Sequence, residues 1–170
     1  MIKVRIEPKP AFQVIGRKIW ISGQENEIFG DFWQRSKEDG LVNRLKEFYH
    51  QKQKPILNSA VFGISCVEKD PSLRSFHFYI AAEADDPIKI LSHNPDLEIY
   101  TVAANEWAVF ENRGNLPEAL IAAEMYAFVE WLPASDYRHA NAPEMELYPP
   151  APGSNTDNDY VEFWLPIRKK

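Results

Sequence analysis

Residues 107–118 have the sequence WAVFENRGNLPE, which passes from strand to helix character within a short span. The first four residues are apolar or aromatic, as in a buried strand. Residues 112–115, Asn-Arg-Gly-Asn, are typical of a turn. Asn115 can cap a following helix whose first turn holds Pro117 and Glu118. We therefore expect a strand, a turn and the start of a helix here.

The chain beyond this turn continues with helical periodicity. One apolar stripe of the expected helix contains Leu116, Leu120, Ala123, Ala127 and Trp131. Pro133 predicts the end of this helix. Two strands are expected after it, over 144–148 and 159–167. Between them, residues 149–155 are rich in Pro, Gly and Ser, and we expect a mobile loop.

The same order of elements precedes the opening segment. The expected elements are a strand over 11–21, helical residues from Glu27 to Gln51 with a break at Gly40, and strands over 60–67 and 75–83. Phe12–Arg17 also corresponds weakly in sequence to Trp107–Arg113. We therefore predict one α+β domain, residues 1–170, with two related strand-helix-strand-strand units at about 10–84 and 105–167. Such a duplication puts the helices outside and leaves a cleft at the pseudo-twofold seam.

The segments outside the two units add little to this plan. Residues 97–102 are strand-like, and 85–96 form a polar stretch with two prolines, expected to be a loop with at most one helical turn. Residues 1–7 alternate like a strand and lack the apolar core of a signal peptide. No apolar run approaches the ~20 residues of a membrane span. We expect a cytoplasmic protein with no membrane partner.

Composition and charge limit the class of function. The net charge is −6, and no stretch is a basic stripe, so direct nucleic-acid binding is not expected. The single cysteine, Cys66, excludes an internal disulfide. Aromatic residues make up 13% of the chain, which suits a large core, a ligand pocket or both.

Glu146 is the main candidate for ligand binding. In an alternating strand, Glu144, Glu146 and Tyr148 share one face and Met145 and Leu147 share the other. If the Met145/Leu147 face packs on the helices, the Glu146 face lines the concave side of the sheet. A buried carboxylate is costly unless it is paired, and a cationic ligand could supply the partner. The alternative is that both glutamates are simply solvated.

Aromatic side chains near such a carboxylate would add cation–π attraction to a bound cation. The candidates are Tyr79, Trp107, Tyr126, Tyr148 and Tyr160. For any one of them, core packing or a surface position is an equally good interpretation. Trp33, Phe128 and Trp131 are expected in the core.

Catalytic and metal-binding patterns are poor. The four histidines show no metal-ligand spacing, and no nucleophile, phosphate-loop or Cys/His signature is present. We therefore assign no catalytic residue, expect neither a metal nor a cofactor, and leave open whether the chain is an enzyme.

A series of short motifs extends over nearly the whole chain, about residues 2–167. They are Val14-Ile15-Gly16, Phe62-Gly63-Ile64, Trp107-Ala108-Val109-Phe110 with Arg113-Gly114, Trp131-Leu132-Pro133, Glu146-Leu147-Tyr148 and a terminal VEFWLPI over 161–167. In this order and spacing the chain resembles the GyrI-like small-molecule-binding domains. That family includes the effector-binding domains of AraC-type and MerR-type bacterial regulators.

The resemblance implies an antiparallel sheet curved towards a barrel, with a central cleft that takes hydrophobic, often cationic, aromatic compounds in the manner of a multidrug-binding protein. It also implies that a buried Glu in the penultimate strand meets the cation, and the matching position is Glu146. Two features depart from the pattern. The strands begin at residue 2 and leave no room for a DNA-binding domain, and Ser36–Gly40 looks inserted.

Three functions follow as hypotheses. The first is a stand-alone effector-binding protein for small hydrophobic or cationic organic ligands, linked to transcription regulation or drug sensing. The second is a small hydrolase that uses Glu146 as acid/base, with Tyr126 as an orienting group. The third is an interaction protein of the gyrase-inhibitor type, with a protein partner that the sequence does not identify.

Overall fold

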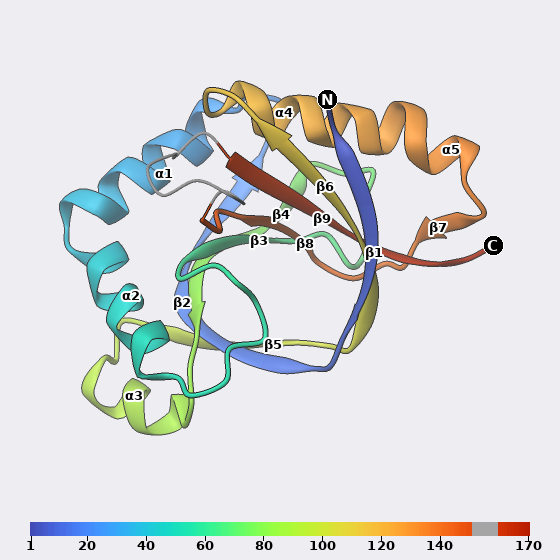
Figure 1. Cartoon of the computed structure of the whole chain (residues 1–170). Helices are drawn as coiled ribbons and strands as arrows, with labels where there is room; N and C mark the ends of the chain where they lie inside the picture. Colours follow the sequence, from blue (N-terminus) through green and yellow to red (C-terminus); the bar gives the residue numbers. More distant parts are fainter. Residues whose placement is uncertain (151–159) are drawn as a thin grey trace.

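One antiparallel sheet with helices on its outer side forms the protein in the computed structural model, which describes residues 1–150 and 160–170 (Figure 1). The strands are β1 (Lys3–Lys9), β2 (Phe12–Ser22), β3 (Phe62–Cys66), β4 (Ser75–Glu83), β5 (Glu98–Val102), β6 (Asn105–Arg113), β7 (Tyr137–His139), β8 (Glu144–Leu147) and β9 (Tyr160–Lys169). The helices are α1 (Glu27–Glu38), α2 (Leu41–Gln51), α3 (Pro87–His93), α4 (Glu118–Met125), the π-helical η1 (Tyr126–Trp131) and α5 (Leu132–Ala134). Of the loop expected over 149–155, residues 151–155 lie outside the described residues.

The strand order of the sheet is symmetric about its centre. The order is β1-β6-β9-β8-β3-β4-β2-β5, with β7 pairing β9, and every pair is antiparallel. The run β6-β9-β8 mirrors β2-β4-β3 across the β8–β3 pair. The predicted α+β class is confirmed, although in the described residues no pairing of β1 with β5 closes a barrel. The mirrored order supports the internal duplication, which remains a prediction that superposing the two halves would test.

Three apolar cores lie on the two faces of this sheet. The inner core gathers side chains from strands across the sheet, among them Phe12, Phe62, Tyr79, Val102, Trp107, Met145 and Trp164. The sheet curves around this core, so the inner core marks its concave side. A second core lies under α1 and α2, and a third lies under α4 and η1. In Figure 1, α1 and α2 lie to the left and α4 and α5 across the top, with the central strands between.

The side of the sheet that Glu146 faces differs from the expectation. The alternation is confirmed, because Met145 and Leu147 are both 1% exposed while Glu146 is only partly buried. However, Met145 and Leu147 pack in the inner core, on the concave side. Glu146 therefore points outward, towards the helices. The reason is that the curved sheet supplies its own apolar interior, so the helices cover the opposite face.

Most predicted elements are present with shifts at their ends. Gly40 separates α1 from α2 with φ +86°, a backbone conformation that glycine adopts without strain. Asn115 does not cap α4 with its side chain, and its backbone carbonyl instead accepts a hydrogen bond from Ala119 at 2.8 Å. The second helical region continues through η1 and past Pro133 to Ala134.

Two short elements were not predicted. Helix α3 replaces the expected loop, because the side chain of Asp86 accepts a hydrogen bond from the backbone N–H of Lys89 and Pro87 occupies the first turn. Strand β7 is too short for a periodic signal, and it pairs with the C-terminal end of β9.

Gly16 allows β2 to lie close against β4. A Cβ atom at this position would lie 2.2 Å from the carbonyl oxygen of Ile80 and 2.8 Å from the Cα of Ala81. We expect Gly16→Ala to lower the free energy of unfolding by about 1–3 kcal/mol, as overpacking typically does. Urea denaturation measures this. Gly30→Ala in α1 is the control, since nothing lies within 4 Å of its added Cβ and the change should be neutral or stabilising. Equal stability of the two variants would contradict the prediction.

Candidate functional site

A large cleft lies between the two helical layers, over the central strands β3 and β8. Its volume is about 1570 Å³, and its lining includes Trp33, Leu120, Glu124, Glu146, Tyr148 and Tyr160. We call this space the main cleft. It lies where the two halves of the sheet meet, as a seam between related units predicts.

Glu146 lies on the sheet side of the main cleft, directly opposite Gly63 of β3. A Cβ atom on Gly63 would lie 2.6 Å from Cγ of Glu146 and 2.7 Å from Cζ of Phe78. The absence of a side chain at Gly63 is therefore what lets the glutamate lie across β3. The hydroxyl of Tyr148 donates a hydrogen bond to the Glu146 carboxylate.

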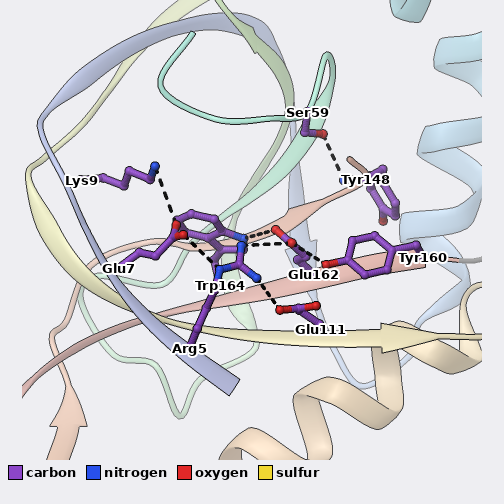
Figure 2. Close-up of polar contacts among 9 residues, drawn as sticks. All are labelled: Arg5, Glu7, Lys9, Ser59, Glu111, Tyr148, Tyr160, Glu162 and Trp164. Atoms are coloured by element: carbon purple, nitrogen blue, oxygen red, sulfur yellow. Dashed lines mark hydrogen bonds and ion pairs between the residues drawn. The ribbon is translucent and has the colours of Figure 1, made fainter. Parts of the chain in front are cut away.

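Aromatic side chains surround this carboxylate. The rings of Trp33 and Tyr148 meet edge to face, with centroids 5.5 Å apart. The backbone N–H of Tyr148 donates to Oγ of Ser59 at 3.0 Å, which fixes the end of β8 (Figure 2). The indole N–H of Trp33 is buried near the Glu146 carboxylate, and with the Tyr148 hydroxyl it opposes the rise in the pKa of Glu146 that burial causes. The main cleft thus combines an acid with aromatic faces.

Three carboxylates come together in the main cleft. Glu124 reaches it from α4, and Glu144 and Glu146 reach it from β8. Nε2 of His139 lies 2.9 Å from Oε2 of Glu144. Burial raises the pKa of Glu146 to about 7, against the opposing effect of the Tyr148 hydrogen bond. Burial, together with the charges of Glu146 and Glu144, raises the pKa of Glu124 to about 8.

These shifts make folding stability depend on pH. Both carboxyl groups have an ordinary pKa of 4.5, so the unfolded chain releases protons that the folded chain keeps. The free energy of unfolding should therefore fall as pH rises from about 4.5 to about 8.

We expect Glu146→Gln to stabilise the protein by about 1–3 kcal/mol at pH 8.5, since one pKa unit corresponds to about 1.4 kcal/mol. At pH 4.5 it should stabilise little. Thermal unfolding at both pH values tests this, and an equal gain at both would contradict it.

The basic side chains of the main cleft are not paired with Glu124 or Glu146. Lys37, Lys46 and Arg74 line it. Arg74 donates to the backbone carbonyls of Gly23 at 2.7 Å and Glu25 at 3.1 Å, and its guanidinium lies over the ring of Phe29. No described residue forms an ion pair with Glu124 or Glu146. The acidic groups are therefore open to a cation from outside.

The structure brings together three of the six predicted site residues. Glu146, Tyr148 and Tyr160 line the main cleft. Tyr79 and Trp107 instead pack in the inner core, and Tyr126 packs on Phe110 with ring centroids 6.1 Å apart. Contact with a ligand is untested for all six and remains a prediction.

Trp33, Phe128 and Glu124 are notable among the residues of the main cleft that had not been predicted as site residues. Trp33 and Phe128, expected in the core, both line the main cleft, and Phe128 is 38% exposed. Glu124 was not a candidate. The sequence feature that could have identified Glu124 is its position four residues after Leu120. This spacing places a carboxylate on the apolar stripe of the helix.

A second, polar cavity of about 510 Å³ lies on the inner face of the sheet, and Tyr160 lines both spaces. Glu162, 5% exposed, accepts hydrogen bonds from Tyr160 at 2.7 Å, Trp164 at 3.0 Å and Arg5 at 3.1 Å. Figure 2 shows Arg5 at the centre of this network, with Glu7 and Glu111 as its further partners. The charged groups of this cavity are therefore paired with one another, unlike those of the main cleft.

The described residues contain neither a metal-binding cluster nor a membrane-spanning helix. No group of three or more His, Cys, Asp or Glu residues in 1–150 and 160–170 is placed to hold a metal ion. None of the helices in this part of the chain is long and apolar enough to cross a membrane.

The fold and the main cleft define a small-molecule-binding protein of the α+β class. The chain matches the family of GyrI-like small molecule binding domains over residues 2–168, and it belongs to that family. In a sequence search, no curated protein matches it.

Several solved structures share this fold. One is SAV2435 bound to tetraphenylphosphonium, with a TM-score of 0.77 and 21% identity over 98% of this chain and 94% of that one. Another is a putative bacterial transcription regulation protein from Staphylococcus aureus MU50, with a TM-score of 0.68 and 20% identity over 98% of both chains. A third is the EcmrR C-terminal domain, with a TM-score of 0.61 and 13% identity over 100% of this chain and 99% of that one.

Proposed function

We propose that the protein binds hydrophobic, cationic, aromatic compounds in the main cleft and acts as an effector-binding protein. The observation that carries this proposal is the Glu146 carboxylate, which lies among aromatic rings without a protein cation as partner. Burying a carboxylate costs free energy, and a bound cation offsets that cost. The rings of Trp33 and Tyr148 add cation–π attraction of about 0.5–2 kcal/mol each.

The similar structures support this choice of ligand. SAV2435 was solved with tetraphenylphosphonium, a bulky aromatic cation, and EcmrR was solved in a complex with DNA. We extend the first observation to the ligand class of this chain. We extend the second to a role in transcription regulation or drug sensing, in the cytoplasm and without direct contact with nucleic acid.

A panel of cationic dyes and tetraphenylphosphonium with a thermal-shift readout tests the proposal. Saturable stabilisation of about 2.7 kcal/mol at a ligand concentration of 100 times the Kd, without turnover, is expected. No stabilisation by any aromatic cation would overturn it.

Two results would favour the other functions. Product formation that is lost in Glu146→Gln would favour the hydrolase, for which the Glu146–Tyr148 pair is the acid/base candidate that the structure offers. Recovery of a stoichiometric protein partner would favour an interaction protein.

A further inference from the structure

We propose that Glu124 is a second anionic anchor in the main cleft, so that the main cleft selects aromatic ligands with two positive charges over those with one. This inference rests on the proposed function and specifies its ligand class.

Glu124 and Glu146 reach the same space from different elements of the fold. Glu124 comes from helix α4, and Glu146 comes from the central strand β8. A ligand that fills the main cleft therefore meets one carboxylate from each element. Glu144 lines the same space, but it is engaged by His139 at 2.9 Å.

The Glu124 carboxylate has no partner within the described part of the chain. It makes no hydrogen bond or ion pair there, and it is partly buried in the wall of the main cleft. Arg74 acts on its pKa from a distance, but Nε and one terminal nitrogen of Arg74 donate to the carbonyls of Gly23 and Glu25, not to Glu124. A buried carboxylate without a partner is costly, and a structural role would normally provide one.

Two carboxylates in one cleft favour a ligand with two positive charges. Burial raises the pKa of both groups, and the charge of Glu146 raises the pKa of Glu124 further, so the free protein keeps protons on them more readily than an exposed carboxyl group does. A ligand with one positive charge neutralises one carboxylate and leaves the other protonated or unpaired. A ligand with two positive charges displaces both protons and pairs both groups.

The main cleft also has the size and surface for such a ligand. Its volume of about 1570 Å³ exceeds the roughly 300–1000 Å³ common for small-molecule pockets. Ile121, Met125 and Phe128 flank Glu124 along the same helical region and expose apolar surface to the main cleft. An extended aromatic dication can therefore place one charge near α4 and the other near β8.

Ethidium and propidium test the inference, because they share one aromatic ring system and carry one and two positive charges. By fluorescence titration at pH 8, the wild-type protein should bind propidium about 10- to 100-fold more tightly than ethidium. Glu124→Gln should remove that preference and change the ethidium affinity less than about threefold. Glu130→Gln is the control, since Glu130 is exposed on the adjoining π-helical stretch and should change neither affinity.

The remaining outcomes of the titration distinguish failure of the Glu124 proposal from failure of the proposed function. Equal wild-type affinities for the two dyes, or equal losses for both in Glu124→Gln, would overturn the role of Glu124 while leaving the proposed function intact. Binding of neither dye by the wild-type protein, together with no binding of tetraphenylphosphonium, would overturn both proposals. A thermal unfolding curve for each variant separates a loss of binding from a loss of folding.

Discussion

Glu146→Gln should weaken the binding of tetraphenylphosphonium about 30- to 1000-fold. The substitution keeps the shape of the side chain and an acceptor for the Tyr148 hydroxyl, and it removes only the charge. Truncating one partner of a desolvated ion pair costs about 2–4 kcal/mol, because the cation is then buried without its counter-charge. At about 1.4 kcal/mol per tenfold, this cost corresponds to the stated loss of affinity.

A neutral ligand provides the first control for this result. Triphenylphosphine oxide carries similar phenyl rings without a net charge, so its contacts are with aromatic and apolar side chains. Its affinity should change little in Glu146→Gln. Titration calorimetry of both ligands measures the difference, and equal losses for the two would contradict the role of Glu146.

Glu144→Gln provides the second control. Glu144 lies on the same face of β8, but His139 lies 2.9 Å from its carboxylate and competes with a ligand for it. Its loss should therefore affect the cation less than the loss of Glu146. A larger effect at Glu144 would transfer the charge-binding role to that residue.

The sequence predicted the faces of the strands but not the side of the sheet to which each face belongs. The alternation along 144–148 separates Glu146 from Met145 correctly. An alternating strand has the same pattern whether its apolar face meets helices or a curved sheet. The choice depends on how far the sheet curves, which long-range strand pairing determines.

Tertiary packing also decided which aromatic residues reach the main cleft. Tyr148 and Tyr160 reach it, whereas Tyr79 and Trp107 turn into the inner core. All four lie in or beside predicted strands with similar patterns, so local sequence could not separate them. Glu124 shows the opposite case. A carboxylate on an apolar helical stripe is visible in the sequence. That this carboxylate lines the same cleft as Glu146 depends on the packing of α4 and β8, which local sequence does not determine.

Glu162→Leu should destabilise the protein by about 2–4 kcal/mol, the largest change in stability that we expect from a single side chain. Its side chain is 7% exposed and holds Arg5 at 3.1 Å, together with hydrogen bonds from Tyr160 and Trp164 (Figure 2). Removing it leaves two buried donors and a cation without their common acceptor. Because Glu162 and its hydrogen bonds from Tyr160 and Trp164 are shielded from solvent, although Arg5 is 35% exposed, most of the loss should persist at high salt.

Glu7→Leu is the matched control, because Glu7 also pairs with Arg5, at 3.0 Å, but its side chain is 34% exposed. Its loss should cost about 0.5 kcal/mol or less, as for an exposed ion pair. Glu162→Gln should fall between the two, since it keeps an acceptor for the buried donors and removes one of the three carboxylates that pair with Arg5. Urea denaturation of the three variants at low and high salt gives the order directly. Similar losses for Glu7→Leu and Glu162→Leu would show that burial of Glu162 does not govern its contribution.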